Sequence, residues 1–469
     1  MNYYFPNYYS SKAIYFYLGS LALVSLLFFN RIIPVHWALM GCIQVVAFFV
    51  AGNLLTRKWV DREEKRFVKD LFAYSLLIRL VWVVFSYLLY QTMTGRPFEF
   101  SAADSLGYHR TAQWLSNGSL VTAWKTLVAM GGGGVSDAGY SFYLTLLYKI
   151  LGSEVLFPRL IKALLSAYMV VVVYRLAQRN FGDDAGRMAG IFTMLMPNLI
   201  YYNGLHLKEI EMVFLTVWFL ERADKLMRSD VVNIPNLVLI IVIAAVLFTL
   251  RTVLGVTALF SVLTALILSN RRVSKAANRW FFTLWVLIAI AYFAGGRISN
   301  EIEEVWESRK INQQESYEWR SSREDGNRLA RNISSAYLAP AIFIIPFPTM
   351  VHVESQQNQM LLHGGYYVKN VMAFFVFVAL LLLFTTKKIR EHLLLLSFTF
   401  GYLLVIAFSS FAHSERFHLP VLPLLLILAA YGVENVSPKL KVFFVPYLVV
   451  LLVLFVAWSW FKLAGRGLA

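Results

Sequence analysis

The sequence predicts an all-α protein that crosses a membrane many times. Hydrophobic residues make up 58% of the 469 residues, charged residues only 15%, and the mean hydropathy is +0.60. A soluble chain of this length would carry a more polar surface. The apolar residues lie in continuous runs and lack the alternation of a transmembrane barrel, so the spans are expected to be helices.

The predicted spans are runs of mostly apolar residues, because roughly 20 such residues cross about 30 Å of hydrocarbon. About thirteen segments meet this criterion. They lie at 12–30, 36–56, 70–92, 155–178, 186–202, 206–222, 234–250, 252–270, 280–296, 366–386, 391–411, 417–434 and 441–461. The prediction is a single transmembrane domain, 1–469, with long loops at 91–153 and 297–365.

Basic residues alternate between the loops and so indicate the orientation of the chain. Short cytoplasmic loops accumulate Lys and Arg. Such clusters are Arg57, Lys58, Arg62, Lys65, Arg66 and Lys69; Arg175, Arg179 and Arg187; Arg222, Lys225 and Arg228; Arg271, Arg272, Lys275 and Arg279; Lys387, Lys388 and Arg390; and Lys439 and Lys441. One topology fits them all. It places the N-terminus in the cytoplasm and the C-terminus outside, with loops 91–153, 203–206, 297–365 and 412–416 together on the outer face.

The net charge of +16 follows from the same asymmetry. Anionic headgroups of the inner leaflet are the partners that basic loops predict, and no nucleic acid is needed to explain them. The single cysteine, Cys42, lies in the second span, so no intramolecular disulfide is possible. The start of the chain lacks the basic region and cleavage site of a signal peptide, so the first span is expected to be retained.

The first outer loop carries an ionisable cluster, Asp-Ser-Leu-Gly-Tyr-His-Arg at 104–110. The segment 101–117 predicts a short surface helix, with Ser101 or Asp104 as its N-cap. Asp104 and Tyr108 then share one face. A carboxylate beside hydrocarbon is costly, which favours a functional site. The alternative is that Asp104 only caps the helix and Tyr108 only lies in the aromatic belt.

Further ionisable residues precede or connect later spans on the same face. His206, Lys208 and Glu209 come before the sixth span, where a Lys208–Glu209 pair that merely ends a helix is the alternative. Three cations are also expected on this face: Arg251 in the turn between two spans, Lys369 after the stretch 363–367, and Arg416, which closes His413-Ser-Glu-Arg416. Each of the three cations could instead be an interfacial anchor.

Taken in order, these residues resemble the GT-C superfamily of membrane glycosyltransferases, especially the bacterial relatives of protein mannosyltransferases and aminoarabinose transferases. The resemblance covers roughly residues 100–225, about a third of the chain. It rests on Asp104, Tyr108 and Ala112, the stretch 139–148, Arg159, Phe181-Gly182 before Ala185, and Pro197, Tyr201 and Glu209.

The resemblance implies a GT-C-like helical bundle, a sugar donor linked to polyprenyl phosphate, and transfer with inversion at the anomeric carbon. The acceptor would be a lipid, a lipid-linked glycan or another molecule at the periplasmic face of a bacterial inner membrane. Asp104 would take the proton of the acceptor hydroxyl, with Tyr108 or His109 beside it and Glu209 as a second acid. His206, Lys208, Arg251, Lys369, His413 and Arg416 would bind substrate, and the cations among them would stabilise the leaving phosphate.

Asp104 and Glu209 could also hold a divalent metal, Mg or Mn, through their oxygens. Many relatives have two adjacent acids where this chain has Asp104-Ser105, which argues against a tightly bound metal. Two other functions stay open: a polymerase or ligase that uses the same carrier, and a flippase or transporter for lipid-linked sugars. Transporters usually place broken helices and charges at the membrane midplane. The charges of this chain gather at one face, which favours an enzyme.

Overall fold

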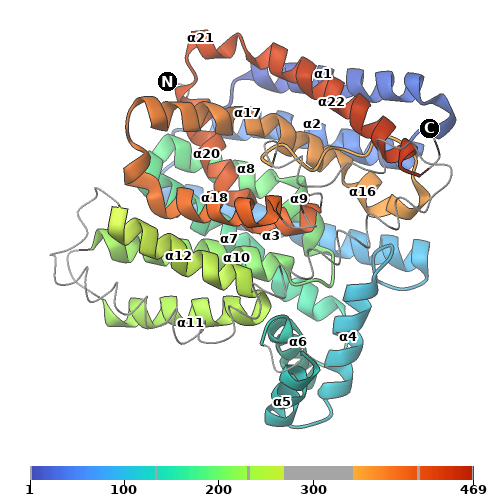
Figure 1. The fold of residues 1–469 in the computed structure, drawn as a ribbon, viewed down its shortest axis with the longest axis vertical. Coiled ribbons are helices and arrows are strands. Elements are labelled where there is room, and N and C mark those ends of the chain that lie inside the picture. Colours follow the sequence, from blue (N-terminus) through green and yellow to red (C-terminus); the bar gives the residue numbers. More distant parts are fainter. Residues whose placement is uncertain are drawn as a thin grey trace.

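The computed structural model describes residues 3–131, 135–229, 233–268, 342–408, 412, 414–466 and 468. These residues form a bundle of helices, in which the only β contact among them is an isolated bridge between Ile32 and Val351 (Figure 1). The predicted all-α fold is therefore confirmed. The predicted span 280–296 lies outside the described residues.

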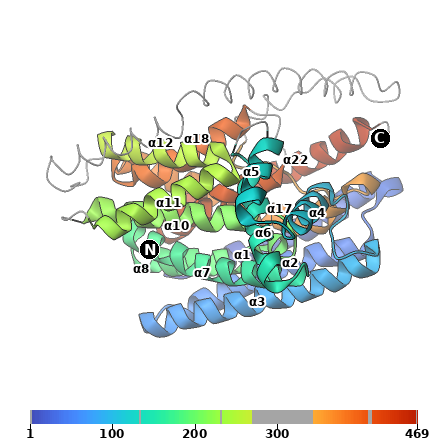
Figure 2. The ribbon, with the colours of Figure 1, turned by 90° about the horizontal axis from the view of Figure 1, so that it is seen from below.

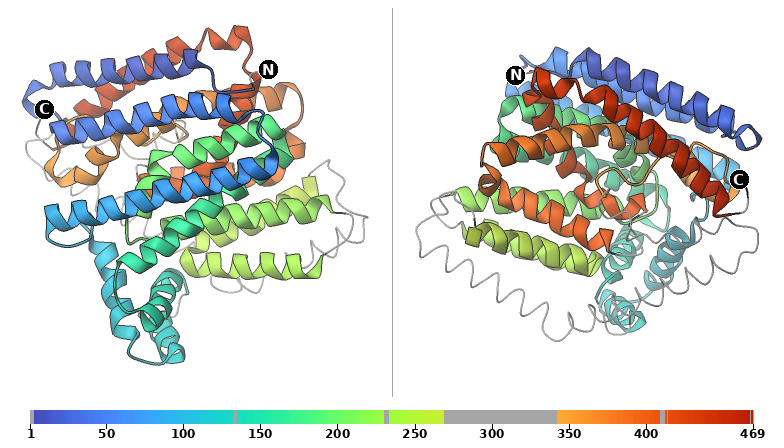
Figure 3. Two further views of the ribbon diagram at one scale, coloured as in Figure 1. Left: turned by 180° about the vertical axis from the view of Figure 1, so that it is seen from behind. Right: turned by 45° about the horizontal axis from the view of Figure 1, so that its top comes forward.

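The described α-helices are α1 Asn7–Leu27, α2 Val35–Trp59, α3 Glu64–Thr94, α4 Ala103–Leu115, α5 Leu120–Met130, α6 Ala138–Leu151, α7 Leu156–Phe181, α8 Asp183–Leu195, α9 Pro197–Asn203, α10 Glu209–Arg228, α11 Ile234–Leu250, α12 Thr252–Leu268, α16 Gln357–Leu361, α17 His363–Thr385, α18 Leu393–Ala407, α19 Glu415–His418, α20 Leu422–Asn435, α21 Pro438–Lys441 and α22 Phe444–Ala464. Short 3-10 turns are η1 Phe29–Arg31, η3 Glu354–Gln356, η4 Ile389–His392 and η5 Leu419–Val421. The long helices run roughly parallel, as α1, α2 and α3 do in the left view of Figure 3.

Eight helical segments of the described chain are long and apolar enough to cross a membrane. They are Asn7–Leu27, Val35–Trp59, Glu64–Thr94, Leu156–Phe181, His363–Thr385, Ile389–Ala407, Glu415–Asn435 and Pro438–Ala464. Each coincides with a span predicted from the sequence. The chain is a multi-pass membrane protein.

Four further predicted spans differ from this pattern for physical reasons. The helix α11 is apolar but has only 17 residues, and α12 is apolar over the 17 residues Thr252–Leu268 that the structure describes. The predicted span 206–222 corresponds to α10, which is buried inside the bundle and carries acids at both ends. Because protein surrounds this helix, its surface does not have to be apolar. The predicted span 186–202 is divided into α8 and α9 by Pro197.

Arg79 stabilises the break between α8 and α9. Proline cannot continue the hydrogen bonding of a helix and leaves carbonyl groups without their usual donors. The guanidinium of Arg79, fully buried in α3, donates to the carbonyl oxygens of Thr193 at 3.4 Å and Met194 at 3.3 Å. Its Nε also donates to Ser166 Oγ at 2.7 Å. A buried cation thus satisfies the end of α8 and fixes where α9 begins.

The basic loops meet at one end of the bundle, which we call the basic end. Arg187 Nη1 donates to the carbonyl oxygen of Trp59 at 3.0 Å, and Arg179 pairs with Glu221 at 2.8 Å. His392 lies 3.2 Å from the side-chain oxygen of Asn180. Loops 57–63, 179–187, 221–228 and 387–392 therefore lie together, as the alternation of charge predicts. The two chain termini lie at opposite ends of the bundle (Figure 1).

The opposite end, which we call the site end, carries the first long loop. This loop folds into α4, α5 and α6, which project to one side of the bundle in Figure 1 and face the viewer in Figure 2. Asn358, just before α17, donates to the carbonyl oxygen of Phe100 at 2.6 Å. The end of the predicted long loop 297–365 thus contacts the first loop. Its part 297–341 lies outside the described residues.

The segment 342–353 enters the bundle as irregular, buried chain. Its backbone is satisfied by polar side chains of α17: Lys369 Nζ donates to the carbonyl oxygen of Ile345 at 2.7 Å, and Asn370 donates to that of Pro346 at 3.2 Å. Phe347 packs edge-on against Trp458 of α22. Non-helical chain at this depth is tolerated where protein covers it and supplies hydrogen bonds.

We expect Gly432→Ala to destabilise the bundle, because α17 and α20 approach closely at this residue. An added Cβ would lie 2.0 Å from the carbonyl oxygen of Phe375, and backbone cannot yield as a side-chain tip can. The expected loss of unfolding free energy is about 1–3 kcal/mol, the usual range for overpacking. Thermal unfolding in detergent measures it. Gly19→Ala is the matched control, because nothing lies within 4 Å of its Cβ; equal midpoints for both variants would contradict the prediction.

Candidate active site

Two carboxylates and one guanidinium meet at the site end. Arg416 Nη1 contacts Asp104 Oδ2, and Arg416 Nε contacts Glu209 Oε1. The side chain of Asp104 is 55% exposed, that of Arg416 22%, and that of Glu209 is fully buried. This group, which we call the acid–arginine centre, therefore extends from the surface into the protein. All three residues are candidates predicted from the sequence, and the structure brings them together.

Each member of the centre stands at the end of a helix. Asp104 lies in the first turn of α4, Glu209 is the first residue of α10, and Arg416 follows the first residue of α19. Negative side chains are favourable at a helix N-terminus because the macrodipole is positive there. The prediction that Ser101 or Asp104 caps α4 is wrong. The N-cap residue is Ala102, and the Asp104 side chain is turned to Arg416.

Tyr108 lies one turn after Asp104 on the same face of α4, as the spacing predicts. Its ring meets that of Tyr140 edge-on, with centroids 5.0 Å apart. Burial raises the pKa of Tyr108 to about 12, and the nearby charge of Glu209 adds to the effect. The hydroxyl therefore stays protonated at neutral pH and can serve as a hydrogen-bond donor beside the carboxylates.

Lys208 and Arg251 place further positive charge near the centre. Lys208 Nζ contacts Asp137 Oδ1 and donates to the carbonyl oxygen of Leu250 at 2.8 Å, so it ties the start of α10 to the turn between α11 and α12. Arg251, in that turn, lies over the ring of Phe417 with its guanidinium carbon 4.2 Å from the ring centroid. Because Phe417 follows Arg416 in the chain, Arg251 lies beside the same short segment that carries Arg416.

His109 and His206 lie away from Asp104 and are joined by a tyrosine. The hydroxyl of Tyr148, on α6, is 2.7 Å from His109 Nδ1 and 3.0 Å from His206 Nε2. This hydroxyl can donate to one ring and accept from the other. The expectation that His109 supports Asp104 is not met, because His109 is five positions after Asp104, on a different face of α4, and its partner is Tyr148. His109 instead joins α4 to α6.

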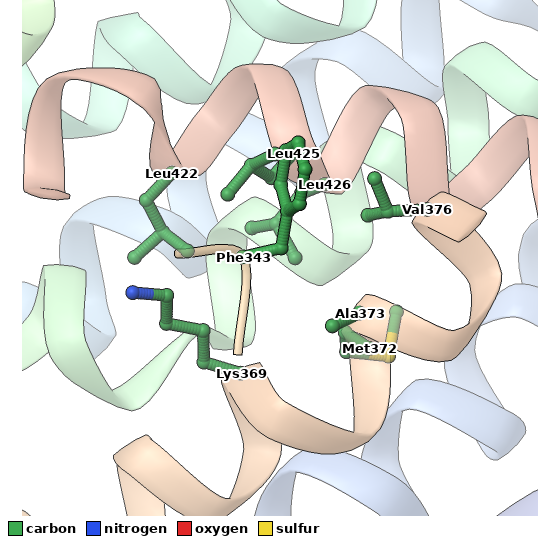
Figure 4. Close-up of a pocket in the computed structure, with 8 residues that line it drawn as sticks. All are labelled: Phe343, Lys369, Met372, Ala373, Val376, Leu422, Leu425 and Leu426. Carbon is green, nitrogen blue, oxygen red and sulfur yellow. The ribbon is translucent and has the colours of Figure 1, made fainter. Parts of the chain in front are cut away.

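Lys369 lies behind the centre and is buried. It is 3.7 Å from Glu415 Oε2 and 3.2 Å from His418 Nδ1. Glu415 also accepts from Asn198 at 2.7 Å. Lys369 therefore supports the residue before Arg416, and its observed partners are protein groups. It also lines a small pocket (Figure 4), whose other walls are Phe343, Met372, Ala373, Val376, Leu422, Leu425 and Leu426.

His413 lies outside the described residues. For the predicted metal, the cation that both Asp104 and Glu209 contact is the Arg416 guanidinium. Within the described ranges, no group of three or more His, Cys, Asp or Glu side chains is arranged to hold a metal ion. These residues do not fit a divalent ion as they stand, so no catalytic step is derived through one.

Several polar residues around the centre were not predicted from the sequence. Asp137 adopts a left-handed conformation, with φ 64°, and reaches Lys208. Lys162, on α7, pairs with Glu211 on α10 at 3.6 Å. Glu99, before α4, accepts from Ser105 at 2.5 Å, and burial raises the pKa of its carboxyl. Lys162 could have been found, because an ionisable residue inside a predicted span is a functional candidate by default.

We expect the stability of the protein to fall as the pH drops below about 6.5, with His109 as one cause. Burial, with the charge of Arg110, lowers the pKa of His109 in the folded state. At pH values between the folded pKa of His109 and its ordinary value, the unfolded chain therefore binds more protons than the folded protein. The free energy of unfolding then falls as the pH drops through this window. Thermal unfolding in detergent from pH 7.5 to 5 measures the effect. His109→Asn should flatten the slope; an unchanged slope would contradict the assignment.

Comparison with known proteins adds one family. Residues 137–298 match the model of the Alg9-like mannosyltransferase family, which has the GT-C fold. The match includes Lys208, Glu209 and Arg251 but neither Asp104 nor Arg416. No curated protein matches the chain significantly. The match confirms the resemblance to GT-C membrane glycosyltransferases.

Proposed function

We propose that this GT-C-type membrane glycosyltransferase transfers a sugar from a polyprenyl-phosphate donor to an acceptor hydroxyl, with inversion at the anomeric carbon. The observation that carries the proposal is the acid–arginine centre. One carboxylate of the centre is exposed to an incoming acceptor, and a guanidinium beside it can meet an anionic leaving group. A family match over residues 137–298 supplies the reaction class.

Asp104 is the proposed base. The acceptor oxygen attacks the anomeric carbon while its proton passes to the carboxylate of Asp104, and the bond from that carbon to the phosphate oxygen breaks. The electron pair leaves with the polyprenyl phosphate. A positioned base of this kind contributes about 10²- to 10⁴-fold to the rate. The 55% exposure of the side chain suits a base that must be reached from outside the bundle.

Arg416 and Arg251 are the proposed contacts of the leaving phosphate. Guanidinium groups bind phosphate oxygens through charge-assisted, often bidentate hydrogen bonds. Fixed positive charge where negative charge develops lowers the barrier without reorganisation. Arg416 is already held by Glu209, so its orientation is set before the donor arrives. Tyr108 and Lys208 are proposed to contact the sugar or the phosphate at the edge of the same centre.

The site end is proposed to face the periplasm of a bacterial inner membrane, with the N-terminus in the cytoplasm. The basic loops at the opposite end support this orientation through the positive-inside bias. A carrier lipid could then present its phosphate at the membrane surface beside α4. The acceptor is proposed to be a lipid, a lipid-linked glycan or another hydroxyl compound that reaches the same surface.

The test uses the purified protein in lipid vesicles. Short polyprenyl-phosphate sugars are supplied with a pool of lipid and glycan acceptors, and both the glycosylated product and the released polyprenyl phosphate are measured. Equal amounts of the two support the proposal. Movement of the donor across the bilayer without release of its phosphate would instead identify a flippase. Growth of a glycan in steps of several sugars would identify the polymerase or ligase alternative.

A further inference from the structure

Lys162 is a buried cation that the proposed chemistry does not use. Its side chain, on α7, is 1% exposed. The ammonium donates to the carbonyl oxygen of Leu205 at 2.8 Å and to that of Leu207, and it lies 3.6 Å from Glu211 Oε2. We propose that Lys162 is a positioning residue. By holding the turn 204–208, it sets where Glu209 meets Arg416. The effect on catalysis rests on the proposed function, but the effect on the turn does not.

The contacts of Lys162 hold a segment of irregular backbone in place. The turn 204–208 joins α9 to α10 as irregular chain, in which the amides of Gly204 and Leu205 still donate to the carbonyl oxygens of Tyr201 and Tyr202. An ammonium has three protons to donate. Two of them go to backbone carbonyls of the turn, and the Glu211 carboxylate of the helix that follows is an ion-pair partner at 3.6 Å. Both sides of the turn are thereby tied to one point on α7.

The other residues of the turn are held by other parts of the protein. His206, between the two bound carbonyls, reaches the Tyr148 hydroxyl at 3.0 Å. Gly204 packs so closely on α3 that an added Cβ would lie 2.2 Å from Ser86 Oγ. Lys208 is tied to the carbonyl oxygen of Leu250. Because the next residue is Glu209, a shift of the turn moves the buried carboxylate that orients Arg416.

A second role must be separated from positioning. Lys162 also neutralises Glu211, which is 6% exposed, and removal of one partner of a buried pair leaves an uncompensated charge. The two roles respond differently to a second substitution. In the variant Lys162→Met with Glu211→Gln, no orphaned charge remains, but the two carbonyls are still without their ammonium. Positioning is then still lost, whereas charge balance is restored.

The experiment compares Lys162→Met, the double variant Lys162→Met with Glu211→Gln, and Lys462→Met. Lys462 is the matched control: it is also a buried lysine, but it donates to Thr349 Oγ1 at 2.7 Å and Gln356 Oε1 at 2.6 Å, away from the turn. The measurements are kcat and KM for the donor, thermal unfolding, and hydrogen exchange of the amides 204–209.

We expect kcat to fall by about 10²-fold in both Lys162 variants, the effect of a misplaced group, with a smaller change in KM. Their amides at 204–209 should exchange faster, whereas Lys462→Met should change only stability. Recovery of wild-type kcat and exchange in the double variant would overturn the proposal, since charge balance alone would then suffice. Hydrogen exchange does not depend on turnover. An inactive wild type would therefore refute the proposed function, while the exchange measurement would still test whether Lys162 holds the turn.

Discussion

Asp104→Asn is expected to reduce turnover by about 10²- to 10⁴-fold, the contribution of a positioned general base. Asparagine keeps the size of the side chain and one oxygen near Arg416, but it cannot take a proton from the acceptor. Stability should change by less than about 1 kcal/mol, because the pair with Arg416 is half-exposed on the side of Asp104. Loss of activity would therefore occur in a folded protein.

The control for Asp104→Asn is Glu154→Gln, which removes another exposed carboxylate, between α6 and α7. Both variants are assayed for product formation in vesicles, and their thermal unfolding is compared with that of the wild type. Turnover should survive in Glu154→Gln. If Asp104→Asn retained turnover within a few-fold of the wild type, Asp104 would not be the base.

Arg416→Met is expected to cost about 3–5 kcal/mol of stability as well as activity, since it breaks a buried ion pair and leaves one charge behind. The carboxylate left behind is Glu209, which is fully buried and whose Oε2 has no hydrogen-bond partner among the described residues. The donor phosphate would lose its closest proposed cation at the same time. Thermal unfolding in detergent and the vesicle assay measure the two effects separately.

A double variant, Arg416→Met with Glu209→Gln, separates the two roles of the arginine. Removing the orphaned charge should return much of the stability, because the neutral amide is less costly to bury. Activity should stay low, since Arg251 alone then replaces the two proposed guanidinium contacts of the leaving phosphate. Recovery of turnover in the double variant would show that Arg416 serves only to neutralise Glu209.

The sequence predicted the helical class and the two ends of the bundle, because composition and the alternation of basic loops are one-dimensional signals. It failed where tertiary packing decides. The helix α10 looked like a lipid-exposed span, but it is surrounded by protein and can carry charge. The break at Pro197 needed Arg79, which is distant in the chain, to satisfy its carbonyls.

The same limit applies to the candidate site. Asp104, Glu209 and Arg416 stood out because ionisable residues are rare in this chain and these three lie on predicted outer turns. His109 is adjacent in sequence to Tyr108, which shares a face of α4 with Asp104, yet helical geometry points it to Tyr148. Lys369 was expected at the surface, but it lies buried against Glu415. Partners of this kind depend on how distant helices pack, which spacing along the chain does not encode.

The arginine that joins the two acids comes late in the chain, 312 residues after Asp104 and 207 after Glu209. During synthesis, α4 and α10 would therefore be made long before their common partner emerges from the ribosome. Until the segment Glu415–Asn435 is made, Glu209 would lie in an incomplete bundle without Arg416, either exposed to water or protonated. Chains truncated before this segment should therefore be inactive, and membrane quality-control proteases should degrade them faster than the full-length protein.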